Sequence, residues 1–340
     1  MSFLIRPIQE KDLDAVFELA KQTGPGMTSL PADKVLLSKK IQESLNGFKI
    51  EPLSPGSESY RLIMEYDSEI VGIAGIRAKV GGFEPFYSYE MKQARHESIS
   101  LKVDKQIPYL ELAQEYNGPT IIGSLFLSPT VRGKGLGKYL SRSRFMFMAD
   151  QMHRFADQVI AEMRGVINTD GKSPFWEGTI RHFFNIEYDQ ADYLSAKDKG
   201  FIAELMPRYP IYIPLLRDEA INVIGEVHPE TKAALKFLED EGFSKDNHVD
   251  IFDAGPRVIV DTQEIETIKN SLLVKVKEIL EEENNFTDCD EYLISNSKLD
   301  IRISKGKVKL SNNNQASISS KLAKQLGVKS NETIRVHKSS

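Results

Sequence analysis

The feature of this sequence that most constrains its fold is a group of three glycines between an apolar run and an amphipathic segment. Gly133, Gly135 and Gly137 follow the apolar run 120–128 and open the segment 133–156, whose apolar residues recur at helical spacing. Glycine permits a positive φ and a close approach of a ligand to the main chain, and a helix start offers free N–H groups and a positive dipole end. The pattern therefore predicts a strand, a tight loop and a helix that together bind a phosphate group.

The spacing of the glycines shows which of the known phosphate-binding motifs this sequence matches. A dinucleotide fingerprint GxGxxG that began at Gly133 would need a glycine where the chain has Lys138, and the Walker pattern GxxxxGK[ST] does not occur here. The pattern that fits is RxxGxG, which runs from Arg132 to Gly137. The loop is therefore expected to bind a pyrophosphate other than that of a nicotinamide dinucleotide or of a nucleotide in a P-loop.

Strand-like and helix-like segments alternate along the first half of the chain. Apolar, β-branched runs predict strands, and segments with apolar residues at helical spacing predict helices. The expected strands are 3–8, 60–78 as a hairpin, 120–128 and 157–167, and the expected helices are 9–23, 133–156 and 173–185. This mixed order predicts the α/β or α+β class.

A similar order recurs further along the chain. Pro229 suits the first turn of a helix that Gly242 ends, and an aromatic residue and a strand follow, as in the segment 175–188. Two related halves are therefore expected. From about Thr262 the pattern changes to a charged helix, a hairpin and a closing β-rich segment, and the charged helix is expected over 271–285. The predicted domains are 1–195, 196–261, which carries the second half, and a small β-rich appendage, 262–340.

Charge and cysteine content narrow the classes of partner and compartment. The net charge is −5 and the lysines and arginines are spread along the chain, which disfavours nucleic acid and anionic membranes as partners. The single cysteine, Cys289, cannot form an intramolecular disulfide, and neither a leader pattern nor a long apolar run is evident, so the cytoplasm is expected. Acidic residues flank Cys289 and disfavour its thiolate, so we expect direct transfer without a cysteine intermediate.

The RxxGxG motif and several longer blocks resemble a known enzyme family. RxxGxG is the pyrophosphate motif of the GNAT superfamily of N-acyltransferases, which the segment 3–188 resembles in the order of its elements. Nearly the whole chain resembles the arginine N-succinyltransferase family, which includes the alpha subunit of an arginine/ornithine succinyltransferase. The blocks that carry this resemblance are TSLPAD (28–33), LFL (125–127), SRFMFM (143–148), AEMRGV (161–166), SPFW (173–176), FIAELMP (201–207) and VHP (227–229).

The resemblance implies an activity and its substrates. It implies a GNAT-like acyl-CoA fold that transfers the succinyl group of succinyl-CoA to the α-amine of L-arginine, as the first step of arginine breakdown. Succinyl-CoA would be a co-substrate, no metal would be needed, and the single RxxGxG predicts one acyl-CoA site per chain. L-Ornithine or another acyl-CoA remains an alternative, as does a non-catalytic acyl-CoA-binding subunit that needs a partner. A homo-oligomer and a complex with a paralogous beta subunit are both open.

The resemblance also assigns roles to the strand and loop. The strand residues Leu125, Phe126 and Leu127 would bond the acyl-CoA arm and the thioester oxygen through their backbone, with Leu125 indicated in particular. Their side chains are expected to be ordinary core. The pyrophosphate would be bound by Arg132, Gly133, Lys134, Gly135 and Gly137.

Acyl transfer to an amine requires a group that accepts or donates a proton. Of the six histidines, His228 precedes Pro229 at an expected helix start, where the helix dipole disfavours imidazolium and leaves a neutral ring able to take a proton. On these grounds alone it would more often be a cap or a surface residue. It matches the catalytic histidine of the family, which is described as a proton donor.

Two charges in an apolar strand are candidates for binding the substrates. Glu162 and Arg164 lie in the expected strand 157–167, and an unpaired charge is costly to bury. The alternative is that they pair with each other or with neighbours as part of the structure. Succinyl-CoA and arginine together bring two carboxylates and a guanidinium, which such charges would meet.

Overall fold

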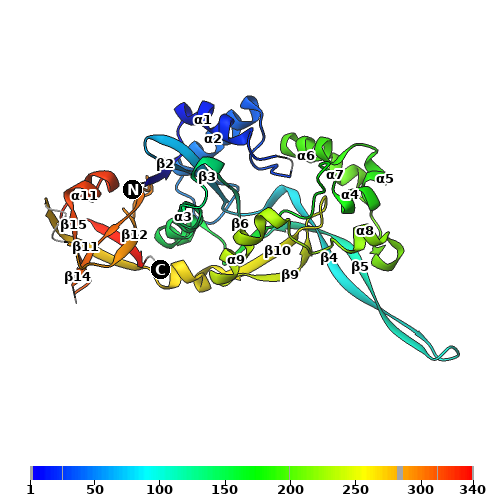
Figure 1. The fold of residues 1–340 in the computed structure, drawn as a ribbon. Helices are drawn as coiled ribbons and strands as arrows, with labels where there is room; N and C mark the ends of the chain where they lie inside the picture. The colour runs from blue at the N-terminus through cyan, green and yellow to red at the C-terminus, as the bar shows by residue number, and fades with distance from the viewer. Residues whose placement is uncertain (1–2, 25, 199, 282–285, 312, 339–340) are drawn as a thin grey trace.

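The computed structural model describes residues 3–24, 26–198, 200–281, 286–311 and 313–338. Within these residues the strands form one mixed sheet of 16 strands that extends through the molecule, with helices on its faces (Figure 1). The strand order is β14-β15-β11-β16-β12-β13-β1-β2-β3-β6-β7-β10-β9-β4-β5-β8. The predicted mixed α/β class is confirmed.

The N-terminal part of the sheet carries two helices on one face. Its elements are β1 (Phe3–Pro7), α1 (Leu13–Ala20), α2 (Lys34–Lys49), β2 (Ser59–Tyr66), β3 (Glu69–Arg77) and β6 (Thr120–Leu127). The side chain of Asp33 caps α2 by accepting from the N–H groups of Val35 and Leu36. Buried residues of α1 and α2 pack on Ile63 and Phe126, so these helices form the wall above this face of the sheet.

The central part holds the largest core. Helix α3 (Leu136–Asp150) packs on the other face of the strands, and β7 (Gln158–Glu162) follows it. The short helices are α4 (Pro174–Gly178), α5 (Arg181–Phe184), α6 (Tyr188–Lys197), α7 (Gly200–Leu205) and α8 (Asp218–Ile221). The remaining elements are β8 (Ile211–Tyr212), η5 (Pro229–Thr231), α9 (Lys232–Asp240), β9 (Ser244–Val249) and β10 (Pro256–Asp261). Helix α9 buries Leu235 and Leu238 in the same core as α3.

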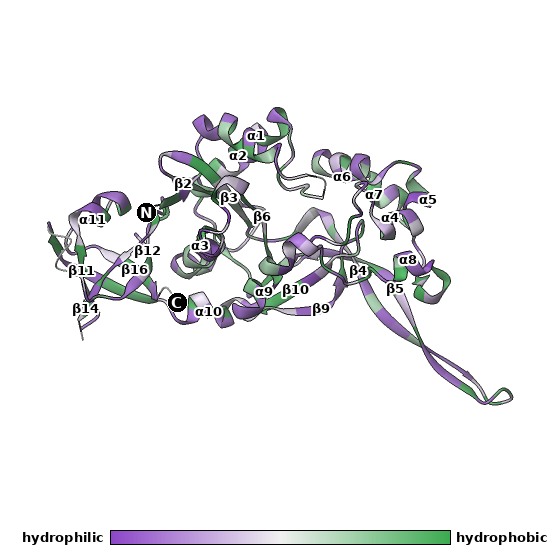
Figure 2. Ribbon diagram, viewed as in Figure 1, coloured by the Kyte–Doolittle hydropathy of each residue, from purple (hydrophilic) through white to green (hydrophobic). Residues whose placement is uncertain are grey.

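A long hairpin projects from the body of the molecule. Strands β4 (Gly81–Ser98) and β5 (Val103–Asn117) pair along most of their length, and Figures 1 and 2 show them extending well beyond the neighbouring strands. Figure 2 also shows hydrophilic and hydrophobic residues interspersed along them. A two-stranded ribbon is at best marginally stable alone, so its base needs support from the body.

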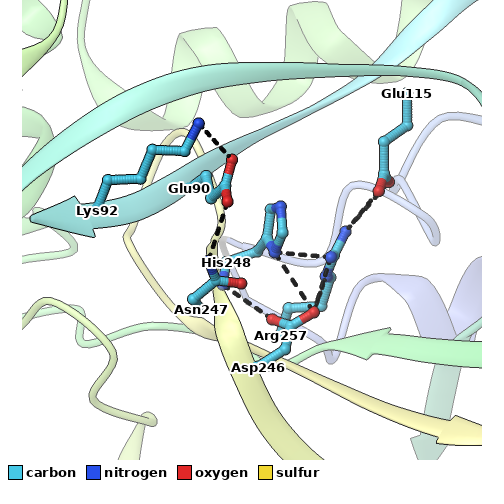
Figure 3. Close-up of polar contacts among 7 residues, drawn as sticks. All are labelled: Glu90, Lys92, Glu115, Asp246, Asn247, His248 and Arg257. Atoms are coloured by element: carbon cyan, nitrogen blue, oxygen red, sulfur yellow. Dashed lines mark hydrogen bonds and ion pairs between the residues drawn. The ribbon is translucent and has the colours of Figure 1, made fainter.

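A polar network supports the base of this hairpin (Figure 3). Arg257 of β10 donates from Nε to Asp246 of β9 at 2.7 Å, and its Nη1 contacts Glu115 of β5 at 3.1 Å. Its Nη2 also contacts the Nδ1 atom of His248 at 2.7 Å. Burial raises the pKa of the Asp246 carboxyl, but hydrogen bonds from His248 and Arg257 outweigh burial and lower this pKa overall. The buried arginine therefore ties the hairpin to the strands beside it.

The C-terminal segment is β-rich as expected, but one of its elements differs from the prediction. Its elements are α10 (Glu266–Lys269), β11 (Leu272–Leu280), β12 (Glu291–Ser295), β13 (Ile303–Lys307), β14 (Lys309–Ser311), β15 (Gln315–Ser319), α11 (Ser320–Leu326) and β16 (Thr333–Lys338). The expected charged helix over 271–285 is wrong, because its first part is the strand β11. Val274 and Val276 are buried while Lys275 is exposed, which is the alternation of a strand. Residues 282–285 lie outside the described part.

The segment after residue 271 has a core of its own yet joins the same sheet. Val274, Val276 and Leu322 belong to a cluster separate from the central core. Strand β13 nevertheless pairs with β1, at Ile303 and Ile5. The predicted boundaries after residues 195 and 261, and the relation between two halves, remain predictions.

Candidate active site

The strand before the glycine loop has a bulge where it separates from its parallel neighbour. Strands β6 and β7 pair at Thr120 and Ile121, and the pairing ends there in the described structure. On the other side the register with β3 shifts, so Ser124 and Leu125 together face Ala74. Ser124 has a φ of 50°, a left-handed conformation that marks local strain. Bulges of this kind are frequent beside active sites, because they turn backbone groups out of the ladder.

The side chains of this strand are packed as expected. Phe126 is buried in the core under α1 and α2, and Leu125 and Leu127 pack on the core that contains α3. The contribution predicted for Leu125, Phe126 and Leu127 therefore concerns their backbone. Strand β7 does not pair with β6 along these three residues.

The glycine loop has the conformation predicted for it. Gly133 and Gly135 have φ values of 80° and 72°, and Gly135 is the N-cap of α3 without a side-chain cap. Gly137 lies in the first turn of α3, where the N–H groups point out of the helix start. A Cβ atom at Gly133 or Gly135 would meet nothing within 4 Å. The loop is therefore open space bordered by backbone donors, as an anion site requires.

Two cations lie beside this loop. The guanidinium of Arg132 donates to the carbonyl oxygen of Leu127 at 3.4 Å and lies 5.9 Å from the centre of the Phe126 ring. Lys134 Nζ lies 4.8 Å from the centre of the Tyr66 ring. Both residues are exposed, so their charge is available to a ligand at the start of α3.

His228 lies next to the end of β7. Its backbone N–H donates to the carbonyl oxygen of Arg164 at 2.8 Å, and its ring Nδ1 accepts from the N–H of Glu230 at 3.2 Å. His228 is thus the cap of η5, as the simpler interpretation of the sequence expected. Because Nδ1 accepts this hydrogen bond, the proton of the neutral ring is on Nε2. The ring can therefore donate from Nε2 without losing its cap.

The environment of His228 favours the neutral ring. Burial and then the nearby Arg164 guanidinium lower the pKa of the His228 imidazole, and the Glu230 carboxylate opposes this shift. The helix start to which the ring bonds acts in the same direction. The sequence-based expectation of a neutral imidazole is consistent with this lowered pKa, although a ring with its proton on Nε2 is a donor and not a base.

The ring of His228 should titrate below its ordinary pKa. We expect the titration midpoint of the ring below 6.5, because burial and the Arg164 guanidinium disfavour the cation. The proton of the neutral form should be on Nε2, because Nδ1 accepts the backbone N–H of Glu230. Nitrogen NMR of histidine-labelled protein measures both quantities, and His228→Asn identifies the signal by its loss. A midpoint above 6.5 or a neutral form protonated on Nδ1 would contradict this description of the site.

The structure separates the two charges that the sequence singled out. Glu162 is the last residue of β7 and lines a cleft described below. Arg164 lies two residues further along, and its Nη1 approaches Glu230 Oε2 at 3.6 Å. Its carbonyl oxygen binds the N–H of His228. Arg164 therefore contacts the histidine, while Glu162 faces the cleft.

A cleft of 620 Å³ adjoins the bulge in β6. Gly123 and Ser124 line it beside Glu162, and on the opposite side it is lined by α2, β2 and β3, including Arg61 and Arg77. Sequence analysis did not single out these two arginines. Arg61 lies in the apolar run YRLIM, so the signal that identified Glu162, a charge within an apolar strand, would also have found it.

Two features are absent from the described residues, a metal-binding cluster and a membrane-spanning helix. Those residues contain no cluster of three or more His, Cys, Asp or Glu side chains placed to bind a metal. Nor is any described helix both long and apolar enough to span a membrane.

A bulged strand that separates from its parallel neighbour is thus followed by an open glycine loop at the next helix start. The family model described as "Arginine N-succinyltransferase beta subunit" matches residues 3–267. The chain belongs to the arginine N-succinyltransferase family.

Individual relatives agree with this assignment. The chain is 42% identical to "Arginine N-succinyltransferase subunit beta" of Pseudomonas aeruginosa, over 87% of this chain and 86% of that protein. It is also 42% identical to "Arginine N-succinyltransferase" of Citrobacter koseri, over 84% of each. A solved structure of "arginine/ornithine succinyltransferase subunit AI" from Pseudomonas aeruginosa superposes with a TM-score of 0.88 at 34% identity, covering 99% of this chain and 98% of that one. The fold therefore extends beyond residue 267.

Proposed function

We propose that the chain transfers the succinyl group of succinyl-CoA to the α-amine of L-arginine, giving N-succinylarginine and CoA. The observation that carries this proposal is the match to the family over residues 3–267. The open glycine loop and the bulge in β6 support it, because a loop of this kind suits an anion and a bulge turns backbone groups out of the ladder. We expect the reaction to take place in the cytoplasm.

The proposed donor is bound by backbone groups and by the loop. The pyrophosphate of CoA would bind the N–H groups at the start of α3, between Arg132 and Lys134. The thioester would lie at Leu125, where a backbone N–H stabilises the negative charge that develops on the carbonyl oxygen. Such donors, fixed before the reaction, contribute more than donors that must reorient.

The reaction is balanced without an enzyme-bound intermediate. The neutral amine attacks the thioester carbon, the C–N bond forms as the C–S bond breaks, and the proton lost by nitrogen appears on sulfur. An α-amine has a pKa of about 8, so a usable fraction is neutral near pH 8. The nitrogen proton passes to sulfur through solvent, and His228 would stabilise the departing sulfur by a hydrogen bond from Nε2 while it keeps its own proton. Glu162 and Arg164 remain candidates for substrate contacts.

The proposal is tested by measuring release of the CoA thiol from purified chain. Succinyl-CoA, acetyl-CoA and butyryl-CoA are each combined with L-arginine and L-ornithine, and CoA binding is measured separately by calorimetry. We expect the highest kcat/KM for succinyl-CoA with L-arginine. CoA binding with no thiol release from any pair would contradict a single-chain enzyme.

The names of the relatives define two further candidates. The related structure is of an arginine/ornithine enzyme, so a higher kcat/KM with ornithine would change the proposed acceptor. That structure and one relative are both called subunits, which favours assembly with a partner chain. Light scattering of the purified chain during the same assay measures whether it acts as a monomer, a homo-oligomer or only with a second subunit.

A further inference from the structure

One row of residues crosses the floor of the cleft. Arg61 of β2 pairs with Gly75 of β3, and Gly75 pairs with Gly123 of β6. Residues paired across antiparallel strands present their side chains on the same face. The face is open at Gly123, where a Cβ atom would meet nothing within 4 Å, and at Gly75 a Cβ atom would lie 3.0 Å from Ser124 Oγ. The row therefore leads from Arg61 to the bulge at Ser124, with no side chain of its own between them.

Arg61 is a buried cation whose hydrogen-bond partners are uncharged. It is 6% exposed, and its Nη1 donates to Ser59 Oγ at 2.8 Å and to the carbonyl oxygen of Lys40 at 3.1 Å. Its Nε is buried and has no hydrogen-bond partner in the described part of the chain. Burial of an arginine without a bonded anion is costly. The side chain lines the cleft, so an anion could reach it there.

The charges around Arg61 leave it without full compensation. Burial lowers the pKa of the Arg61 guanidinium to about 10, the Glu43 carboxylate opposes this shift, and the Arg77 guanidinium adds to it. Among the residues of α2, β2 and β3 that line the cleft, Lys39, Lys40, Arg61 and Arg77 are cationic and Glu43 is acidic, whereas Glu162 lies at the end near β7. The Arg61 end therefore favours a negatively charged ligand.

We propose that Arg61 binds a carboxylate group of a bound substrate, with Arg77 beside it, and so sets the specificity of the transfer. This inference rests on the proposed function. Two strand spacings of about 4.8 Å separate the backbones of Arg61 and Gly123, a span that an arginine side chain and a short carboxylic acid cover together. The planar guanidinium suits a carboxylate, because it can form two parallel hydrogen bonds with it.

Two carboxylates in the reaction have this chemistry. One is the terminal carboxylate of the succinyl group and the other is the α-carboxylate of the amino acid. Butyryl-CoA replaces the first carboxylate by a methyl group, and agmatine is arginine without the second. Each carboxylate can therefore be removed from the substrate while the rest of the molecule is kept.

The test compares the wild-type chain with Arg61→Met, which keeps the length of the side chain and removes its charge. Calorimetry measures the Kd of succinyl-CoA and butyryl-CoA, and of L-arginine and agmatine in the presence of CoA. Thiol release measures kcat/KM for the same pairs. Arg95→Met, on the exposed hairpin, is the control and should leave all values unchanged.

We expect Arg61→Met to lose about 10²- to 10³-fold in affinity and kcat/KM for one carboxylate-bearing substrate only. Loss for succinyl-CoA but not butyryl-CoA assigns the succinyl carboxylate. Loss for L-arginine but not agmatine assigns the α-carboxylate. The thermal midpoint should not fall, because a methionine avoids an unpaired buried charge.

Two results would overturn the inference. One is an equal loss for all substrates together with a lower thermal midpoint, as expected of a purely structural arginine. The other is no loss for any substrate. The Kd values test binding by Arg61 even when no pair of substrates reacts. Failure of the proposed function is therefore recognised separately from failure of this inference.

Discussion

Replacement of His228 by alanine is expected to lower kcat about 10²- to 10³-fold, with the Kd of CoA changed less than threefold. Removal of one hydrogen-bond donor to charge that develops in the transition state costs about this much. The ring lies beyond the end of β7, whereas the pyrophosphate is expected at the start of α3. Steady-state thiol release measures kcat, and calorimetry measures the CoA affinity. Turnover near that of the wild type would remove His228 from the mechanism.

The structural role of His228 needs its own control. The ring caps η5, and loss of a cap costs about 1 kcal/mol of stability. His228→Asn keeps a side chain that caps well, because its oxygen can replace Nδ1, but it has no counterpart of the Nε2 donor. We therefore expect stability near the wild type and kcat as low as in the alanine variant. His182→Ala, on the exposed surface of α5, should change neither quantity.

Gly135→Val is expected to weaken CoA binding at least 10²-fold. Gly135 has a φ of 72°, a conformation that costs other residues about 1–2 kcal/mol and a β-branched residue more. The valine side chain would also project into the space beside the start of α3, which is open in the structure. Calorimetric titration with CoA measures the effect. Unchanged binding would show that the loop serves another purpose.

A matched glycine separates backbone strain from loss of the anion site. Gly327 ends α11 with a φ of 65°, is exposed, and would make only ordinary contacts through an added Cβ atom. Gly327→Val should therefore lose a similar amount of stability in urea denaturation and bind CoA normally. If both variants lost CoA binding equally, the effect at Gly135 would be one of folding.

Local sequence signals predicted the glycine loop and its neighbours correctly. Gly133 and Gly135 permit the positive φ that this loop has, and α3 begins directly after them. The prediction of a helix where the structure has β11 was wrong because it too relied on local signals. The charged residues in 271–285 indicated an exposed helix. In the structure Val274 and Val276 alternate with lysines, and their strand pairs with β15 on one side and with β16 on the other. Strand pairing between distant segments overrode the local propensity.

The candidate site was predictable where its residues carry their own signal. His228 was singled out by its place before Pro229 together with the family resemblance, and Glu162 by its charge within an apolar strand. The position of the ring proton was not predictable, because it depends on a hydrogen bond from the Glu230 backbone. Arg61 was missed, since its significance depends on what lies across two other strands.

By itself the sequence determined the mixed class, the strand, loop and helix around Gly135, and the family. Local backbone preferences and long matched blocks carry this information directly. Only the tertiary structure decided that Arg61, Gly75 and Gly123 form one row beside the bulge in β6. The physical reason is register: the hairpin of β2 and β3 pairs with β6, a strand much further along the chain, and no local segment specifies that pairing.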